Sequence, residues 1–232
     1  MENTARQPLI LQLYHSPIGK KLMTGVTGLG LAIFVLVHMA GNLLLFAGHD
    51  AYNAYAHHLE SLGPLLWMVE ATLVAVFLIH AIAGIHIFVG KLHARPDRYE
   101  TYASKGEPSL QSISSRTMIV TGIVLATFLV LHLLNFKFGR YYTTQLQGEN
   151  VRDLARLVVA KFQNPVYAFG YSGVMVLLGF HLRHGVWSAL QSLGLQTQSI
   201  RVTLYGLSLG LAIAIAMGFI ALPLTIYFGL VT

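Results

Sequence analysis

Five long apolar stretches constrain the fold of this chain more than any other feature of its sequence. A membrane-spanning helix needs about 20 consecutive, mainly apolar residues. The segments that meet this requirement are residues 22–46, 66–90, 117–137, 166–190 and 203–229. Only 10% of the 232 residues are charged, against about 25% in a typical soluble domain. We therefore predict an all-α integral membrane protein, a single domain over residues 1–232 in which five transmembrane helices form one bundle.

Two connecting segments have helical patterns of their own. Residues 50–62 are expected to form a short helix on the outer membrane surface, and one face of it collects Ala51, Tyr55, His58, Leu59 and Leu62. Residues 150–162, NVRDLARLVVAKF, are expected to form a second surface helix. No internal repeat is obvious.

The positions of Lys and Arg predict how the bundle is oriented. Cytoplasmic loops are enriched in these residues, and residues 46–65 contain none of them. The N-terminal arm, the segment after residue 90 and the last linker contain Arg6, Lys20, Lys21, Lys91, Arg95, Arg98, Lys105, Arg116 and Arg201. We therefore expect the N-terminus in the cytoplasm and the C-terminus outside. The loop over residues 138–165 contradicts this pattern, because it is basic and has to be external if all five segments span.

The composition also excludes several classes of protein. The chain contains no cysteine, which excludes disulfides, cysteine-ligated iron–sulfur clusters and haem attached through a C-x-x-C-H motif. The net charge of +6 agrees with basic cytoplasmic loops, and no nucleic-acid-binding motif is present, so we expect no nucleic acid partner.

Ionisable residues inside the expected spans are the strongest functional signal. Such residues are rare in membranes, and a charged one costs about 2.5–3.5 kcal/mol at the centre of a helix on insertion scales. The set comprises His38, Glu70, His80, His86, His132, His181, Arg183 and His184. One membrane histidine is usually a packing residue, but here each of the first four segments carries at least one, which favours a shared function.

The depth of these histidines predicts how they pair. At a rise of 1.5 Å per residue, His38 and His132 lie about 22–24 Å from the inner ends of their helices. His80 and His181 lie about 14–15 Å from the inner ends of theirs. The sequence therefore predicts an outer pair, His38 with His132, and an inner pair, His80 with His181. Two bis-histidine sites stacked in one bundle suit two haems, with neutral imidazole as the iron ligand.

Glycines near these histidines favour the same choice. A missing side chain about one turn away lets a flat macrocycle approach the backbone, and the glycines concerned are Gly41, Gly84 and Gly185. His184 lies only about 60° around the helix from His181, so it remains an alternative ligand on the fourth segment.

Other polar residues are candidates for supporting roles. Arg116 and Arg183 suit haem propionates, because arginine binds carboxylates in a bidentate manner; the alternative is that both side chains extend to the inner headgroups. Glu70 lies about 15 Å outward of His80, where it either passes protons to a redox partner or simply reaches the interface. Tyr55, His58, Glu60 and Trp67 are weaker candidates of the same kind.

At this level of detail the sequence resembles a known family, the cytochrome b subunit of succinate dehydrogenase. The branch is the one with a single five-helix anchor and two haems, shared with certain fumarate reductases. The stretches that carry the resemblance are TGLGLAIFVLVHMAGNLLLF, AYNAYAHHLESLGPLLW, LIHAIAGIHIF, SSRTMI, LVLHLLNFKFG and LGFHLRHGVWSALQSLGL. It implies two haem b groups ligated by His38, His80, His132 and His181, a quinone site, and docking to a flavoprotein and an iron–sulfur subunit.

The resemblance also implies a function and a location. The chain would be a multi-pass anchor in the lipid of the bacterial cytoplasmic membrane, and succinate would be oxidised on the flavoprotein. Electrons would pass through the iron–sulfur clusters to the inner haem, the outer haem and a quinone, with menaquinone the common quinone of this branch. Glu70 is the first choice for quinone-coupled proton transfer, with Tyr55 and Glu60 nearby. Some fumarate reductases have a carboxylate at the position of Gly179, and its absence here favours succinate oxidation.

Two functions of other classes remain open from the residues alone. A proton or ion transporter could line its path with the histidines and Glu70. A purely structural anchor could bury the same histidines without any haem.

Overall fold

The computed structural model describes residues 16–94 and 113–231, and within them five helices are long and apolar enough to cross a membrane. These helices are α2 (Pro17–Leu43), α4 (Pro64–Ala94), α6 (Met118–His132), α8 (Pro165–Ser192) and α9 (Arg201–Tyr227). A 3-10 turn (η1, Leu44–Ala47) extends α2, and a π-helical turn (η2, Leu133–Lys137) extends α6. The five predicted spans and the all-α membrane bundle are therefore confirmed.

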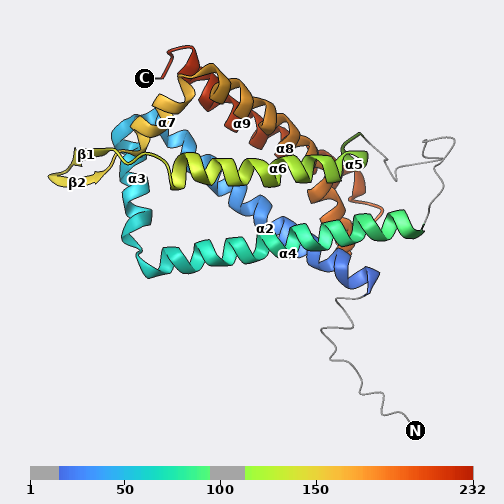
Figure 1. Cartoon of the computed structure of the whole chain (residues 1–232). Helices are drawn as coiled ribbons and strands as arrows, with labels where there is room; N and C mark the ends of the chain where they lie inside the picture. The colour runs from blue at the N-terminus through green and yellow to red at the C-terminus, as the bar shows by residue number, and fades with distance from the viewer. Residues whose placement is uncertain (1–15, 95–112, 232) are drawn as a thin grey trace, which may run out of the picture.

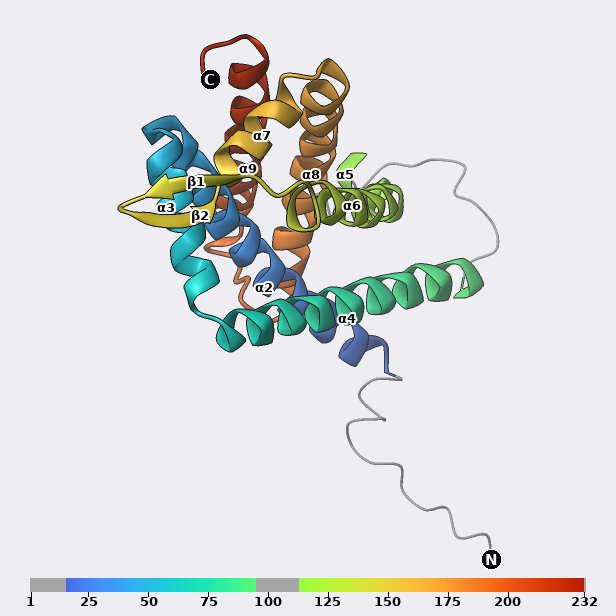
Figure 2. The same cartoon turned by 60° about the vertical axis from the view of Figure 1, so that its left-hand side comes forward.

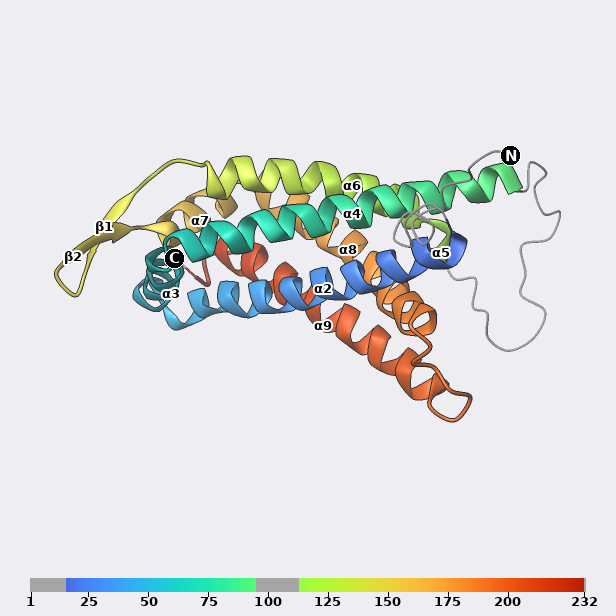
Figure 3. The same cartoon turned by 90° about the horizontal axis from the view of Figure 1, so that it is seen from below.

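The five long helices are not packed equally. Helices α8 and α9 lie side by side along most of their length, α2 packs against α4 and α8, and α6 packs against α8 (Figure 1). Helix α4 is the outermost, because it contacts α2 extensively and α6 only locally (Figures 1 and 2). Seen from below, α9 diverges from α4 (Figure 3). The helices α2, α4, α6 and α8 therefore surround a common interior, and α9 covers the outside of α8 and α2.

Small residues let the helices approach closely. Lipid tails are as apolar as leucine, so packing between membrane helices depends on close contact rather than on burial from water. A Cβ atom added to Gly179 in α8 would lie 3.2 Å from the Cβ of Ala216 in α9, and one added to Gly25 in α2 would lie 3.6 Å from the Cα of Ala189 in α8. Gly179 thus faces α9, and Ala216 occupies the place that a larger side chain would need.

The connecting elements gather at one end of the bundle (Figures 1 and 2). They are the helix α3 (His49–Ser61), a hairpin of β1 (Thr143–Leu146) and β2 (Glu149–Arg152), and the helix α7 (Leu154–Phe162). The strands are antiparallel, with Thr143 opposite Arg152 and Leu146 opposite Glu149. The other end carries the start of α2, the end of α4, the short helix α5 (Ile113–Arg116) and the turn between α8 and α9.

The predicted surface helix over residues 150–162 is wrong in its first part. Residues 149–152 pair as β2, and the helix begins only at Leu154. The reason is the turn at Gln147 and Gly148, which have φ values of 52° and 87°. Two residues with positive φ close a tight hairpin, and the Asp153 carboxylate then caps α7 by accepting from the backbone N–H of Arg156 at 3.0 Å.

The helix predicted over residues 50–62 is confirmed as α3, His49–Ser61. Tyr52 and Asn53 are its buried residues, whereas His58 and Leu62 are exposed. The Asn53 side chain donates to the Asp153 carboxylate at 2.9 Å and accepts from the backbone N–H of Ala155 at 2.9 Å. These hydrogen bonds hold the Asn53 side of α3 against the start of α7.

The basic loop that contradicted the charge pattern lies at the same end as α3, and its cations have partners within the protein. Lys137 forms an ion pair with Glu70, and Lys161 donates to the Asn135 side chain at 3.1 Å. The guanidinium groups of Arg140 and Arg156 lie over the ring of Tyr142, and that of Arg152 donates to the carbonyl of Phe136. Intramolecular contacts therefore account for a basic loop at this end. The orientation of the bundle in the membrane stays a prediction. Four of the basic residues on which it rests lie outside the described residues, namely Arg6, Arg95, Arg98 and Lys105.

We predict that Gly179→Val weakens the packing of α8 on α9. Overpacking of a close contact costs about 1–3 kcal/mol, so the free energy of unfolding should fall by about that amount. Gly173→Val is the matched control on the same helix, because a Cβ at Gly173 meets no atom within 4 Å. Thermal unfolding in detergent measures both variants, and equal losses in the two would contradict the close contact.

Candidate functional site

Four histidines meet in two pairs inside the bundle. The rings of His38 in α2 and His132 in α6 lie 5.8 Å apart between centroids, at an interplanar angle of 87°. The rings of His80 in α4 and His181 in α8 lie 6.3 Å apart, at 70°. A metal held about 2 Å from one nitrogen of each of two imidazoles separates the ring centroids by about 6 Å. The structure thus brings together the two pairs that depth predicts, at a separation that suits one metal ion in each.

The pairs join opposite helices of the bundle. One pair connects α2 with α6 and the other connects α4 with α8, so the four helices face each other diagonally through imidazole rings. Helix α9 contributes no histidine and packs outside this arrangement. We call the His80–His181 pair the inner site and the His38–His132 pair the outer site, after the depths predicted for them. In the same predicted sense, the end of the bundle that carries α5 is called the inner end, and the end that carries α3 is called the outer end.

The inner site has hydrogen-bond acceptors behind both rings. Nδ1 of His80 lies 3.2 Å from the carbonyl oxygen of Thr24 and 3.4 Å from the hydroxyl of Thr27. A carbonyl oxygen only accepts, so Nδ1 of His80 carries the ring proton. Nδ1 of His181 lies 3.0 Å from the hydroxyl of Thr121. Metal-bound histidines usually make this kind of contact through the nitrogen that does not bind the metal.

Glycines support both inner rings from behind. A Cβ atom added to Gly28 would lie 3.0 Å from Cε1 of His80, and one added to Gly122 would lie 3.7 Å from Cε1 of His181. Sequence reasoning missed these glycines and the threonines before them. The signal that could have found them is a repeat, because TGLGLAIFVLVH (residues 27–38) and TGIVLATFLVLH (residues 121–132) share the pattern T-G-x5-F-x3-H.

The glycines one turn beyond the inner histidines border open space. A Cβ atom added to Gly84 or Gly185 meets no atom within 4 Å, which agrees with the room expected for a macrocycle. The same expectation is wrong at Gly41. There a Cβ would lie 2.6 Å from Cε1 of Tyr55, because the Tyr55 ring from α3 already fills the space.

The hydrogen bonds at the outer site come from Asn42 in α2 and Tyr52 in α3. The Asn42 amide donates to the backbone carbonyl of His38 at 2.8 Å and lies 3.3 Å from Nε2 of its ring. The buried Tyr52 hydroxyl donates to the Asn42 oxygen at 3.0 Å, and burial raises the pKa of this phenol, so it stays a neutral donor. Nδ1 of His132 is buried and has no hydrogen-bond partner among the described residues.

The contacts of the polar residues in α8 distinguish their roles. The ring that faces His80 is that of His181, so the geometry favours His181 over His184 as its partner. Arg183 donates to the hydroxyl of Tyr205 in α9, and two residues turn a helix by about 200°. Arg183 therefore lies on the α9 side of α8, away from the inner site. Arg116 is exposed and ends α5 at the inner end of the bundle.

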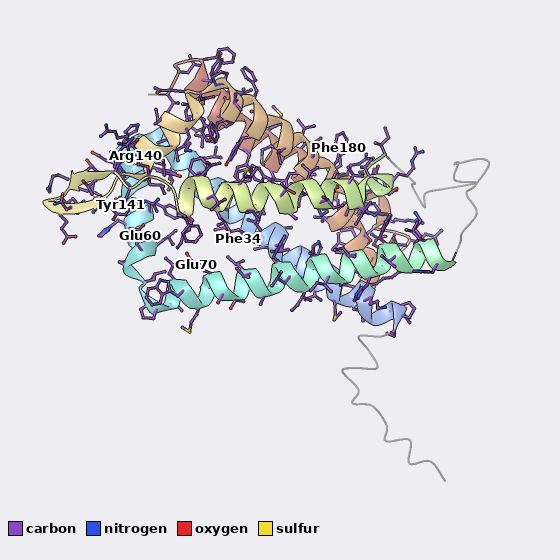
Figure 4. The ribbon with its side chains drawn as sticks, in the orientation of Figure 1. Phe34, Glu60, Glu70, Arg140, Tyr141 and Phe180 are labelled. Atoms are coloured by element: carbon purple, nitrogen blue, oxygen red, sulfur yellow. The ribbon has the colours of Figure 1, made fainter. Side chains whose placement is uncertain are left out.

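The candidate acids lie together at the outer end, but each has its own cation. Figure 4 shows Glu60 and Glu70 near the junction of α3 and α4, with Arg140 and Tyr141 close to the hairpin. Glu70 pairs with Lys137, and these side chains are 39% and 41% exposed. A carboxylate oxygen of Glu60 lies 3.9 Å from a guanidinium nitrogen of Arg152. Trp67, which is 70% exposed, faces the surroundings of the bundle.

The donor set of both sites fits haem. Within the described ranges, no three His, Cys, Asp or Glu side chains gather around a common point, whereas haem iron takes only its axial ligands from the protein. Two imidazoles that face each other would supply the protein ligands of one haem iron. At the inner site the Nδ1 contacts leave Nε2 of each ring available, and the open space beside Gly84 and Gly185 suits a flat group.

One family matches the chain over more than half of its length. Residues 93–221 match the family described as "Succinate dehydrogenase/Fumarate reductase transmembrane subunit". The matched range contains His132, His181 and Thr121, whereas His38 and His80 precede it. No curated protein and no solved structure matches the chain.

We predict that Gly28→Ala damages the inner site and that Gly30→Ala does not. The added methyl group at Gly28 would press on the His80 ring, whereas a Cβ at Gly30 meets no atom within 4 Å. Changes behind a metal ligand typically lower affinity by about 10–100-fold, so bound haem per chain should fall in Gly28→Ala. The pyridine haemochrome assay measures this ratio, and an unchanged ratio in Gly28→Ala would contradict the close approach.

Proposed function

Because the chain belongs to the family of succinate dehydrogenase/fumarate reductase transmembrane subunits, we propose that it is the di-haem, quinone-reacting anchor of a succinate:quinone oxidoreductase. The family makes it a multi-pass membrane subunit of such a complex. The finer proposal rests on one observation, that four histidines face each other in two pairs. The ring centroids in each pair lie about 6 Å apart. The dicarboxylate reaction belongs to a flavoprotein partner, and an iron–sulfur partner connects that reaction to the membrane.

The four histidines are the residues that hold haem in this proposal. His80 and His181 hold the inner haem b, and His38 and His132 hold the outer one. When bound, the two haems supply one-electron carriers between the iron–sulfur partner and quinone. The chain fixes the orientation of the histidine rings, excludes water from them and provides apolar walls such as Phe34, which stacks on His38 at 5.5 Å.

Arginine contacts to the inner haem are assigned to Arg116 and not to Arg183. Arg116 lies at the inner end of the bundle, on the short helix α5 that packs against α8. Arg183 instead donates a hydrogen bond to the hydroxyl of Tyr205, on the far side of α8. A guanidinium at the end of the bundle suits a propionate carboxylate, because such pairs are bidentate.

The quinone is proposed to react at the outer end, beside Glu70. Reduction of a quinone to a quinol takes up two electrons and two protons, so the site needs groups that pass protons. Glu70 and Lys137 are partly exposed and paired, and Lys137 ends the π-helical turn that directly follows His132. This turn links the ion pair to the outer histidine site. Tyr55 and Glu60 supply further polar groups at the same end, and menaquinone is the quinone proposed.

We predict that the purified complex shows a reduced b-type haem spectrum with about two haems per chain, since each bis-histidine site holds one. His181→Ala should remove the inner haem, whereas His184→Ala should leave both. Optical difference spectra and haem-to-protein ratios measure these outcomes.

A colourless, haem-free complex would contradict this function and would favour a structural anchor or a histidine-lined transporter. If His184→Ala removed a haem and His181→Ala did not, the ligand on α8 would be His184.

We predict that Glu70→Gln slows quinone reduction by about tenfold or more, because general acid–base groups typically contribute about 10²–10⁴-fold. Glu149→Gln is the matched control, since Glu149 is an exposed acid at the same end. Succinate-driven reduction of menaquinone and ubiquinone analogues measures the rate, while haem reduction by succinate should stay normal. A normal rate in Glu70→Gln, or an equal loss in Glu149→Gln, would exclude Glu70 from proton transfer.

A further inference from the structure

The repeated segments T-G-x5-F-x3-H place equivalent side chains in equivalent contacts. In α2 the repeat supplies Thr27 and Gly28 behind His80, and in α6 it supplies Thr121 and Gly122 behind His181. The phenylalanine of each repeat stacks on the histidine of the same helix, with angles of 16° in α2 and 26° in α6. The first residues of the repeat therefore serve the inner site, and the last ones serve the outer site.

The hydrogen of the Thr121 hydroxyl determines the direction of its contact with His181. This hydroxyl donates to its own helix, where the carbonyl oxygens of Thr117 and Met118 both lie at 3.1 Å. A hydroxyl has one hydrogen and two lone pairs, so with its hydrogen on either carbonyl it accepts from Nδ1 of His181, and ligation of iron through the available Nε2 requires the same direction. Nδ1 of His181 then carries the proton, and Nε2 keeps its lone pair. The carbonyl of Thr24 fixes the same tautomer in His80.

The two inner rings depend on the hydroxyls to different extents. Within the described residues, the hydroxyl of Thr121 is the one hydrogen-bond partner of Nδ1 in His181, at 3.0 Å. His80 has the Thr24 carbonyl at 3.2 Å in addition to the Thr27 hydroxyl at 3.4 Å. Removing the hydroxyl of Thr121 should therefore affect the inner site more than removing that of Thr27.

We propose that Thr121 is a positioning residue that fixes the tautomer of His181 and thereby lowers the reduction potential of the inner haem. The inference rests on the function proposed above. An acceptor at Nδ1 makes an imidazole a more basic ligand, and a more basic ligand stabilises the higher positive charge of ferric iron. Loss of this acceptor should raise the midpoint potential of the inner haem.

The test uses the purified holo-complex with Thr121→Val, Thr121→Ser, Thr27→Val and Thr127→Val. Thr121→Val removes the hydroxyl at nearly constant volume, and Thr121→Ser restores it. Thr127→Val is the matched control on α6, because the exposed Thr127 hydroxyl donates only to the Ile123 carbonyl. Optical redox titration gives both midpoint potentials, and electron paramagnetic resonance gives the signals of both ferric haems.

The expected result is a raised midpoint potential and a changed resonance signal for one haem in Thr121→Val. That haem should be the one missing in His181→Ala. Thr27→Val should give a smaller change, and Thr121→Ser and Thr127→Val should match the unaltered protein. Loss of the inner haem in Thr121→Val, with recovery in Thr121→Ser, would equally support the proposal.

Two results would overturn it. Potentials and signals that stay the same in Thr121→Val would show that the hydroxyl does not act on the haem. Equal damage in Thr121→Val and Thr121→Ser would show that the methyl group matters rather than the hydroxyl. An unaltered complex without any haem would instead overturn the proposed function itself, and this outcome is read from the unaltered protein alone.

Discussion

Polar nitrogens inside a lipid-facing bundle need partners, and this requirement shapes the interior of the protein. No water at the centre of a bilayer can satisfy them, so an imidazole placed there needs contacts from the protein or from a bound group. Behind each inner ring the requirement is met by a threonine on a neighbouring helix. At the inner site these contacts engage Nδ1 of each ring and leave Nε2 for a bound group. The spacing of about 6 Å between facing rings is what a ligated metal needs.

The same two helices serve both sites. Helix α2 contributes His38 to the outer site and the contacts behind His80 to the inner site, and α6 does the same with His132 and Thr121. A shift of either helix along its axis would therefore disturb both sites at once. Helices α4 and α8 contribute one inner histidine each and complete the diagonal arrangement. The outer end is closed by α3, the hairpin and α7, where ion pairs and cation–π contacts hold the basic loop in place.

Much of this architecture could be predicted from the sequence, because the lipid environment imposes simple rules. Segment length and apolarity located the five spans, and a constant rise per residue located the pairs of histidines. The hairpin was missed because its turn, Gln147–Gly148, lies beside a plausible helical pattern. The side of α3 that packs on α7 could not be predicted, because hydrogen bonds of Asn53 to residues about 100 positions away decide it. The threonines behind the inner histidines were missed because a helical hydroxyl usually bonds only to its own backbone, and the repeat that marks them was not seen.

We propose that each histidine pair ligates one haem iron from both sides. Near-infrared magnetic circular dichroism of the fully oxidised complex tests it most directly, because this signal reports the axial ligands of each ferric haem. We predict bis-histidine, low-spin signals from two haems per chain. A high-spin signal, or a signal of any other axial ligand pair, would contradict the account even if haem were bound.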